Sequence, residues 1–202
     1  AAFIAAAQAK ADAAGTTIFN RQFDHVRAFY GWLEQRFPDG LVMFDDNIVF
    51  AQNFYRVSAK DRFYPNTGIS SLGHAIPAAI GAGFAVDPPL FALIGDGGFH
   101  MCAMETMTAV NYGIPLNIVL FNNNTMGLIR KNQHHLYQDR FIDCDFTNPD
   151  YALLAQSFGI KHCRVESGQD LAKLEAIDFR HGINLIEIMI DQDAYPNYSS
   201  RR

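Results

Sequence analysis

Short runs of wholly apolar residues recur along this chain, and segments with helical periodicity separate them. Residues 41–44 and 91–94 are such runs, residues 117–121 and 185–190 have the same format with one polar residue each, and residues 161–165 form a further candidate strand. A run that is apolar at every position fits a strand buried on both faces, as in a parallel sheet covered by helices. The alternation of such strands with helices predicts an α/β fold, a doubly wound and mainly parallel sheet with helices on both faces.

The helices predicted between these runs follow the spacing of apolar residues and the positions of Gly and Pro. They cover residues 24–37, 48–56, 71–86, 101–112, 149–158 and 168–178. The Ala-rich start, residues 1–14, also favours a helix. We expect residues 1–23 to be a helical lead-in and linker from a preceding domain. Residues 24–202 should form one domain, because a chain of 202 residues with 49% apolar content suits a single buried core.

Composition and charge exclude several classes of function. The net charge is −5 and the basic residues form no stripe, so nucleic acid is not an expected partner. The apolar runs are far shorter than the ~20 residues of a membrane span. The three cysteines, Cys102, Cys144 and Cys163, are odd in number and widely spaced, which fits neither a disulfide framework nor paired metal ligands. We therefore expect a soluble, cytoplasmic protein without a membrane segment.

Two polar residues, Asp96 and Asn123, each follow the end of an apolar run. Ligands of doubly wound sheets bind outside the carboxyl ends of the strands, so both side chains can face one crevice. A carboxylate and an amide oxygen suit Mg²⁺ when phosphate oxygens complete its coordination. Gly97 and Gly98 let the backbone approach an anion, and a helix beginning near Met101 directs its positive end at it. This pattern indicates a metal-bridged diphosphate site, although Gly-Asp-Gly alone is also common as an ordinary strand-to-helix turn.

The spacing of this motif resembles the signature of thiamin-diphosphate enzymes. Gly95-Asp96-Gly97 is followed by a helix with Glu105, then by Pro115, an apolar run and Asn122-Asn123. In that family the second ligand, an Asn, follows the Asp at this separation. The resemblance implies the thiamin-diphosphate-binding fold.

Two other parts of the chain resemble the same family. Residues 68–81, Gly-Ile-Ser-Ser-Leu-Gly-His-Ala-Ile-Pro-Ala-Ala-Ile-Gly, are similar to the helix entry of acetolactate synthases, benzoylformate decarboxylases and their relatives. Residues 126–130 and 148–159 continue the acetolactate-synthase-like pattern. The resemblance thus extends over residues 24–191, which identifies residues 24–202 as a diphosphate-binding domain.

The resemblance assigns roles to individual residues. The metal ligands would be Asp96, Asn123 and the backbone carbonyl of Thr125. Leu72 would be the apolar wedge that holds the cofactor in its V shape, and the backbone of Gly68 would accept a hydrogen bond from its amino group. The full set of expected cofactor contacts is Gly68, Leu72, Gly95, Asp96, Gly97, Gly98, Asn123, Thr125, Met126, Gly127, Leu128 and Asn47.

Two positions depart from the pattern of the relatives. Gly98 stands where they usually have Ser after Gly-Asp-Gly, which removes one hydroxyl contact to the diphosphate. Residues 45–47, Asp-Asp-Asn, stand where they commonly have Gly-Gln-His. Carboxylates beside a diphosphate would repel it by a few kcal/mol if they were poorly solvated. We therefore expect either that these carboxylates point away or that the loop differs.

Other polar and apolar residues near the site allow two interpretations each. His74 and His100 could donate a proton to a substrate carbonyl or bind its carboxylate, or could be structural. Met101 matches a position that lines the substrate pocket, and it could equally be a core residue, as could Leu128. The pair His134-His135 lacks a third metal ligand at suitable spacing and is predicted to be a solvated loop.

The resemblance implies a lyase or transferase that depends on thiamin diphosphate and Mg²⁺, a 2-oxo-acid decarboxylase or carboligase similar to acetolactate synthase. In the family, a Glu on a separate pyrimidine-binding domain, usually of another subunit, activates the cofactor. No segment of this chain resembles that domain. We therefore expect a pyrimidine-binding domain or subunit as partner in a homo- or hetero-oligomer, and an enzyme that is incomplete as this chain alone. Two alternatives stay open: a subunit of a two-chain decarboxylase of the sulfopyruvate type, and a non-catalytic cofactor-binding or assembly module.

Overall fold

The centre of the computed structural model is a six-stranded parallel sheet; the structure describes residues 6, 9–10, 13, 18–87 and 89–198. The strands are β1 (Val42–Asp45), β2 (Arg62–Pro65), β3 (Leu90–Gly95), β4 (Leu116–Asn122), β5 (Lys161–Val165) and β6 (Ile183–Met189). Their spatial order is β2-β1-β3-β4-β6-β5, and all five neighbouring pairs are parallel. The predicted parallel α/β sheet is confirmed.

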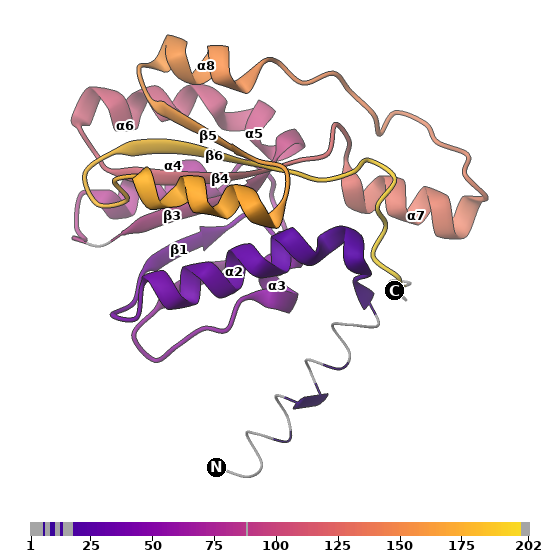
Figure 1. Ribbon diagram of the computed structural model, residues 1–202. Helices are drawn as coiled ribbons and strands as arrows, with labels where there is room; N and C mark the ends of the chain where they lie inside the picture. The colour runs from indigo at the N-terminus through magenta and orange to yellow at the C-terminus, as the bar shows by residue number, and fades with distance from the viewer. Residues whose placement is uncertain (1–5, 7–8, 11–12, 14–17, 88, 199–202) are drawn as a thin grey trace.

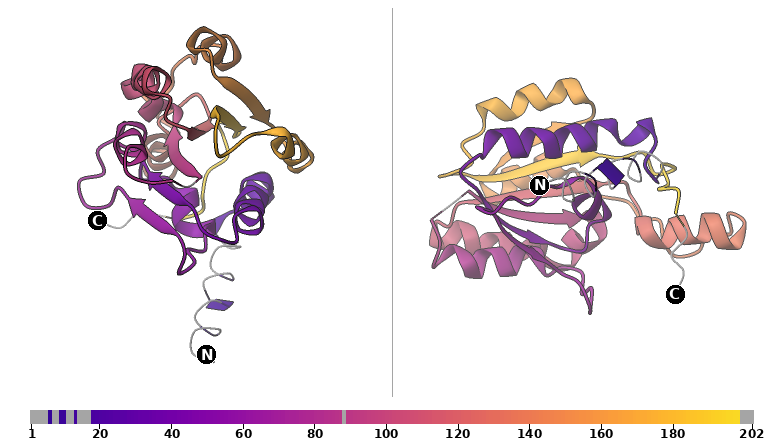
Figure 2. Two further views of the ribbon diagram at one scale, coloured as in Figure 1. Left: turned by 90° about the vertical axis from the view of Figure 1, so that its left-hand side faces the viewer. Right: turned by 90° about the horizontal axis from the view of Figure 1, so that it is seen from below.

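Helices cover both faces of this sheet, as Figure 1 and Figure 2 show. One layer contains η1 (Arg21–Phe23), α2 (Asp24–Arg36), α3 (Val49–Phe54) and η3 (Gly168–Ala176). The other contains α4 (Ala75–Gly83), α5 (Asp96–Cys102), η2 (Ala103–Glu105), α6 (Thr106–Tyr112) and α8 (Tyr151–Phe158). The remaining long helix, α7 (Gly127–Tyr137), extends beyond the carboxyl ends of the strands (Figure 1).

The two central strands divide their side chains between two hydrophobic cores. In β3, Phe91 and Leu93 pack under α2 and α3, whereas Ala92 and Ile94 pack under α4 and α5. Successive side chains of a strand point to opposite faces, and here both faces are covered, so apolar residues are favoured at every position. This double burial explains why β3 and residues 118–121 of β4 are continuous apolar runs in the sequence.

Strand β2 was not predicted, because it has no apolar run. It is an edge strand, and its side chains are exposed except for Phe63, which is half-buried. A strand with few buried positions has no hydrophobic signal. It is defined instead by backbone pairing with β1.

Two helix predictions were wrong at their starts, and one helix was missed. Helix α4 begins at Ala75 and not at residue 71, because Gly73 has a left-handed backbone with φ of +83°. Helix α5 begins at Asp96 itself and not near Met101, although glycine has a low intrinsic helix propensity. Helix α7 was missed, and it contains His134-His135, which were predicted to lie in a solvated loop.

The predicted helix over residues 1–14 lies outside the described residues except at four isolated positions. The division between residues 1–23 and 24–202 therefore stays a prediction. In the part of the chain that the structure describes, none of the helices has the length and apolar character needed to cross a membrane.

Candidate functional site

A cavity of roughly 260 Å³ lies at the carboxyl ends of β1, β3 and β4. From β1 the chain proceeds to β2 on one side, and from β3 it proceeds to β4 on the other, so the direction of the winding changes between β1 and β3. Such a switch point leaves a crevice between the two diverging loops. The cavity is lined by the loops after β1, β3 and β4, by residues 70 and 72, and by the C-terminal segment at residues 190–196.

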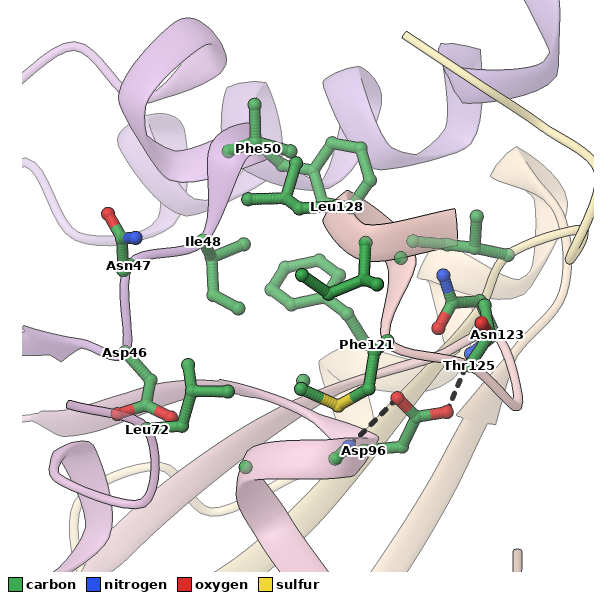
Figure 3. A pocket seen from close by; sticks show the side chains of 18 of the residues that line it. Asp46, Asn47, Ile48, Phe50, Leu72, Asp96, Phe121, Asn123, Thr125 and Leu128 are labelled. Atoms are coloured by element: carbon green, nitrogen blue, oxygen red, sulfur yellow. Dashed lines mark hydrogen bonds between the residues drawn. The ribbon is translucent and has the colours of Figure 1, made fainter. Parts of the chain in front are cut away.

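Asp96 and Asn123 lie next to each other in this cavity (Figure 3). One carboxylate oxygen of Asp96, Oδ2, accepts hydrogen bonds from the backbone N–H of Asn123 at 3.0 Å and of Asn124 at 2.7 Å. Its other oxygen, Oδ1, accepts from the N–H of Gly97 at 3.0 Å. Burial raises the pKa of the Asp96 carboxyl group, and these hydrogen bonds oppose that shift.

Thr125 comes from the same loop as Asn123 and also lines the cavity. Its hydroxyl donates to the carbonyl of Cys144 at 2.8 Å, which fixes this part of the loop. Among the described residues, no three His, Cys, Asp or Glu side chains cluster in a way that could hold a metal ion. A cation at Asp96 would therefore need amide and backbone oxygens, which Asn123 and Thr125 have, and oxygens of a bound ligand.

Asn148 is a functional candidate that the sequence interpretation missed. Its Nδ2 group lies 2.9 Å from Asp96 Oδ2 and 2.7 Å from the side-chain oxygen of Asn122, to both of which it can donate. The hydroxyl of Tyr151 donates to Asn148 Oδ1 at 2.9 Å, which fixes the orientation of the amide. Asn148 therefore holds the Asp96 carboxylate in place from outside the cavity. Its sequence signals were its position just before the start of α8 and its place at the start of residues 148–159, which resemble the family, but neither assigned it a role at the site.

The two histidines named as candidates do not line the cavity. His100 is exposed, its ring packs at a tilt against Phe146, and its Nε2 lies 3.3 Å from the Tyr151 hydroxyl, next to the network around Asn148. His74 is exposed at the start of α4. Neither geometry assigns a chemical role to these histidines.

The apolar candidates separate into two groups. Leu72 and Leu128 line the cavity, from opposite sides in Figure 3. Met101 lies outside the cavity lining and is 63% exposed. Gly68 also lies outside the lining, in a left-handed conformation with φ of +97°. The apolar wall contains further residues that the sequence interpretation did not name: Ile48, Phe50, Phe121, Ile190, Ala194 and Pro196.

Glycines occur where the segments after β3 and β4 pack closely. A Cβ atom on Gly97 would lie 2.4 Å from Met126 Sδ, and one on Gly127 would lie 2.7 Å from Asn123 Nδ2. The backbone after β3 and β4 thus forms a cradle that only glycine permits without movement of its neighbours. Gly95 has more space, because the nearest atom to an added Cβ is Ile48 Cδ1 at 3.8 Å. Such a cradle of backbone N–H groups at a helix start suits an anion.

The carboxylates at the end of β1, Asp45 and Asp46, are both hydrogen-bonded to backbone N–H groups, and Asp46 is the one that lines the cavity. Asp46 lines the cavity, but its oxygens accept hydrogen bonds from the backbone N–H groups of Gly73 at 2.8 Å and His74 at 2.9 Å. Asp45 accepts from the N–H of Ile48 at 2.9 Å. Asn47 has a left-handed backbone, and its side chain accepts from Gln52. The charge of Asp46 is therefore offset by peptide dipoles, which reduces the repulsion expected for a diphosphate.

Asp45 is fully buried, and this burial raises the pKa of its carboxyl group to about 7. The hydrogen bond from the N–H of Ile48 lowers this pKa, and the charge of Asp46 raises it further. An unfolded chain ionises this group near its ordinary pKa of 3.8. Between pH 3.8 and about 7, the folded protein therefore keeps a proton on Asp45 that the unfolded chain has released. The stability that this bound proton contributes is lost as the pH rises through about 7.

We expect the Asp45→Asn variant to lack this dependence on pH. Between pH 5 and pH 7.5, the free energy of unfolding of the unmodified protein should fall by about 2–3 kcal/mol relative to the variant. Urea denaturation at both pH values measures the difference. Parallel pH profiles for the two proteins would mean that Asp45 is already ionised in the folded state at pH 5.

Arg130 fixes α7 and the C-terminal segment at the edge of the cavity. Its guanidinium donates to Asp193 at 2.8 Å and to the hydroxyl of Tyr195 at 3.0 Å, and it forms a short ion pair with Asp145. The Arg130 charge lowers the pKa of the Asp193 carboxyl group. These contacts join segments far apart in the sequence and hold residues 126–129 and 194–196 as walls of the cavity.

Comparison with known proteins yields a family match over most of this region. Residues 46–188 match the family model described as thiamine pyrophosphate enzyme, C-terminal TPP binding domain. The mitochondrial acetolactate synthase of Schizosaccharomyces pombe is 33% identical over 146 residues, 71% of this chain and 22% of that protein. The acetolactate synthase large subunit of Lactococcus lactis is 31% identical over 149 residues, 73% of this chain and 26% of that protein. The chain thus spans about a quarter of the length of these relatives.

Solved structures share the fold. The benzoylformate decarboxylase from Polynucleobacter necessarius superimposes with a TM-score of 0.71 at 24% identity, over 85% of this chain and 34% of that chain. The thiamine diphosphate-dependent 4-hydroxybenzoylformate decarboxylase of Rhodococcus jostii gives the same TM-score and identity, over 83% of this chain and 33% of that chain. At this identity the likeness shows the common α/β architecture.

Proposed function

Since this chain belongs to the thiamine pyrophosphate enzyme family, as a C-terminal TPP-binding domain of the acetolactate synthase and decarboxylase group, we propose that its cavity binds thiamine diphosphate through Mg²⁺ held at Asp96. The observation that carries the proposal is the position of the Asp96 carboxylate beside the loop of Asn123 and Thr125, at the switch point of the sheet. The family match covers residues 46–188 and so includes both Asp96 and the loop of Asn123 and Thr125.

The residues present fit a metal-bridged diphosphate. Mg²⁺ prefers oxygen ligands and keeps only one or two carboxylates, with phosphate oxygens completing the set. The Asp96 carboxylate, the Asn123 side-chain oxygen and the Thr125 carbonyl would hold the metal. The cradle around Gly97 and the first N–H groups of α5 would receive the diphosphate, because a helix start favours negative charge.

Thiamine diphosphate, when bound, supplies an electron sink for breaking the bond next to the carbonyl group of a 2-oxo acid. The residues of this chain would anchor the diphosphate and exclude water with the apolar wall of Ile48, Phe121 and Ile190. Leu72, on the side of the cavity opposite Asp96, would set the conformation of the bound molecule. We propose 2-oxo-acid decarboxylation or carboligation as the reaction, as in an acetolactate-synthase-like lyase or transferase.

We propose further that a pyrimidine-binding domain or subunit completes this site in an oligomer. Support comes from the quarter of the relatives' length that the chain spans and from the apolar side chains exposed on the loops and helices next to the cavity. Ile69 is 91% exposed and Met104 is 68% exposed, and Met101 and Ile129 are also exposed. Contiguous exposed apolar side chains mark surfaces that other proteins cover.

The proposed function is tested by titrating the purified protein with thiamine diphosphate in a calorimeter. With Mg²⁺ present we expect saturable binding, and with EDTA in place of the metal we expect the affinity to fall at least roughly 100-fold, because uncompensated negative charges would meet at Asp96. Thiamine without its phosphates is the control ligand and should bind weakly in both buffers. Equal affinity for thiamine diphosphate with and without Mg²⁺ would contradict the proposal.

A further inference from the structure

The loop at residues 66–74, called here the cofactor loop, joins β2 to α4 and contains Gly68 and Leu72. Its backbone is irregular, and Gly68, Ser70 and Gly73 all have positive φ angles, of +97°, 54° and +83°. Glycine adopts such angles without cost but Ser70 does not, so contacts from outside the loop must offset the cost at Ser70. At its start, the N–H of Asn66 donates to the Asp45 carbonyl at 3.0 Å.

Asp46 provides the support at the other end of the cofactor loop. Its carboxylate accepts hydrogen bonds from the N–H groups of Gly73 and His74, and a longer one from Ala75 at 3.4 Å. The N-cap residue of α4, His74, makes no side-chain hydrogen bond to the helix start, and Asp46 is the acceptor for the N–H groups of the residues that lead into the helix. Asp46 is 1% exposed, so removing its carboxylate leaves buried donors without a partner.

Gly98 leaves the space that this carboxylate occupies. A Cβ atom on Gly98 would lie 2.4 Å from Asp46 Oδ2, closer than non-bonded atoms come. It would also lie 3.1 Å from Ile94 Cγ1 on the other side. A free side-chain tip could rotate away, but the Asp46 carboxylate is held by its hydrogen bonds to the cofactor loop. A side chain at position 98 therefore cannot be accommodated while the Asp46 carboxylate stays where it is.

We propose that Asp46 is the positioning residue of the cofactor loop and that Gly98 is the glycine that Asp46 requires. The two departures from the family pattern, at residues 46 and 98, are then one coupled change. Asp46 fixes the cofactor loop, and thereby the place of Leu72, through backbone contacts that exist without any bound cofactor. Only the consequence for cofactor affinity rests on the proposed function.

The coupling is tested by a double-mutant cycle of Gly98→Ser and Asp46→Ala, read by thermal unfolding. With Asp46 present, Gly98→Ser should lower Tm by roughly 4–8 °C, because an atom is forced into filled space. In the Asp46→Ala background, the same substitution should lower Tm by less than roughly 2 °C, because the space is free. Equal losses in both backgrounds would overturn the coupling. If the Ser variant does not fold, Gly98→Ala in both backgrounds applies the same comparison with a smaller group.

The positioning role is tested by hydrogen exchange of the backbone amides at residues 73–75. The isosteric variant Asp46→Asn keeps one acceptor but turns an N–H₂ group toward an N–H donor, so these amides should exchange at least roughly tenfold faster. Amides of β3 and β4 should not change. The matched control is Asp45→Asn, which alters the neighbouring carboxylate without touching residues 73–75. Unchanged exchange at residues 73–75 in Asp46→Asn would overturn the role of Asp46.

Cofactor binding separates this inference from the proposed function. If the protein binds thiamine diphosphate, Asp46→Asn should weaken binding roughly tenfold and keep its dependence on Mg²⁺, because the metal site at Asp96 is intact. Loss of the Mg²⁺ dependence would contradict a role confined to the cofactor loop. If the unmodified protein binds no thiamine diphosphate, the proposed function fails, while the unfolding cycle and the exchange rates still decide the role of Asp46.

Discussion

The Asp96→Ala variant is expected to lose Mg²⁺-dependent binding of thiamine diphosphate, with an affinity at least roughly 100-fold below that of the unmodified protein, which corresponds to about 3 kcal/mol. Asp46 and Asp96 are the carboxylates among the described residues that line the cavity; both accept backbone hydrogen bonds, but only Asp96 accepts them from the loop that also contains Asn123 and Thr125, whose oxygens could complete a metal site. Asp96 is thus the anionic group available to hold the metal, which in turn neutralises the diphosphate. Calorimetric titration in excess Mg²⁺ measures the loss.

Folding must be separated from binding in this experiment. Asp96→Ala leaves the N–H groups of Asn123 and Asn124 without their acceptor, at a cost of about 1–3 kcal/mol of stability for each buried donor. Asp96→Asn keeps the shape and one acceptor oxygen, so it should fold more stably and still bind poorly. The matched control is Asp150→Asn, which removes a carboxylate from the start of α8, outside the cavity lining. Unchanged affinity in Asp96→Asn would rule out Asp96 as a metal ligand.

The second large effect concerns catalysis by the 202-residue chain on its own. We expect no detectable decarboxylation of pyruvate by this chain, even when it is saturated with thiamine diphosphate and Mg²⁺. Activation of the cofactor needs a carboxylate free to exchange a proton, and among the described residues no Glu lines the cavity. The carboxylates that do line it, Asp46 and Asp96, accept hydrogen bonds from backbone N–H groups.

The assay follows CO₂ release from pyruvate, and calorimetry on the same sample checks that the cofactor is bound. Exchange of the cofactor's own ring proton with deuterium is a second readout, and it should be no faster than in buffer. Turnover by the chain alone would refute the need for a partner domain. Glu105 would then be the first residue to replace, because it lies between Asp96 and Asn123 along the chain and is exposed on η2. Loss of that turnover in Glu105→Gln would identify it.

The sequence was sufficient to predict a parallel sheet and to place Asp96 and Asn123 just after two of its strands. The apolar runs that became β3 and β4 are unbroken because both of their faces are buried. Asp96 and Asn123 follow the ends of these adjacent parallel strands, so strand order alone brings them to the same edge. Both signals are local, carried by residues that are neighbours along the chain.

The conformation of glycine-rich and polar segments was harder to predict. The Gly-Asp-Gly-Gly stretch was interpreted as a loop before a helix, because glycine lowers helix propensity, yet α5 begins at Asp96. Packing of Phe99 into the core compensates for that low propensity. Helix α7 was missed because its buried residues are Arg130 and Lys131, and a search for apolar periodicity does not detect buried charged residues.

The sequence by itself determined the parallel α/β sheet, the placement of Asp96 and Asn123 after two strands, and the family, because these depend on periodicity and on spacing within short segments. The tertiary structure alone decided which partners the polar side chains have. Asp46 contacts the cofactor loop 27 residues away, Asn148 contacts Asp96 from 52 residues away, and Arg130 joins α7 to a segment 63 residues away. Such contacts depend on how separate loops pack at the end of the sheet, and a hydrogen bond needs its atoms placed to within a few tenths of an ångström. No local pattern in one segment encodes the position of another to that accuracy.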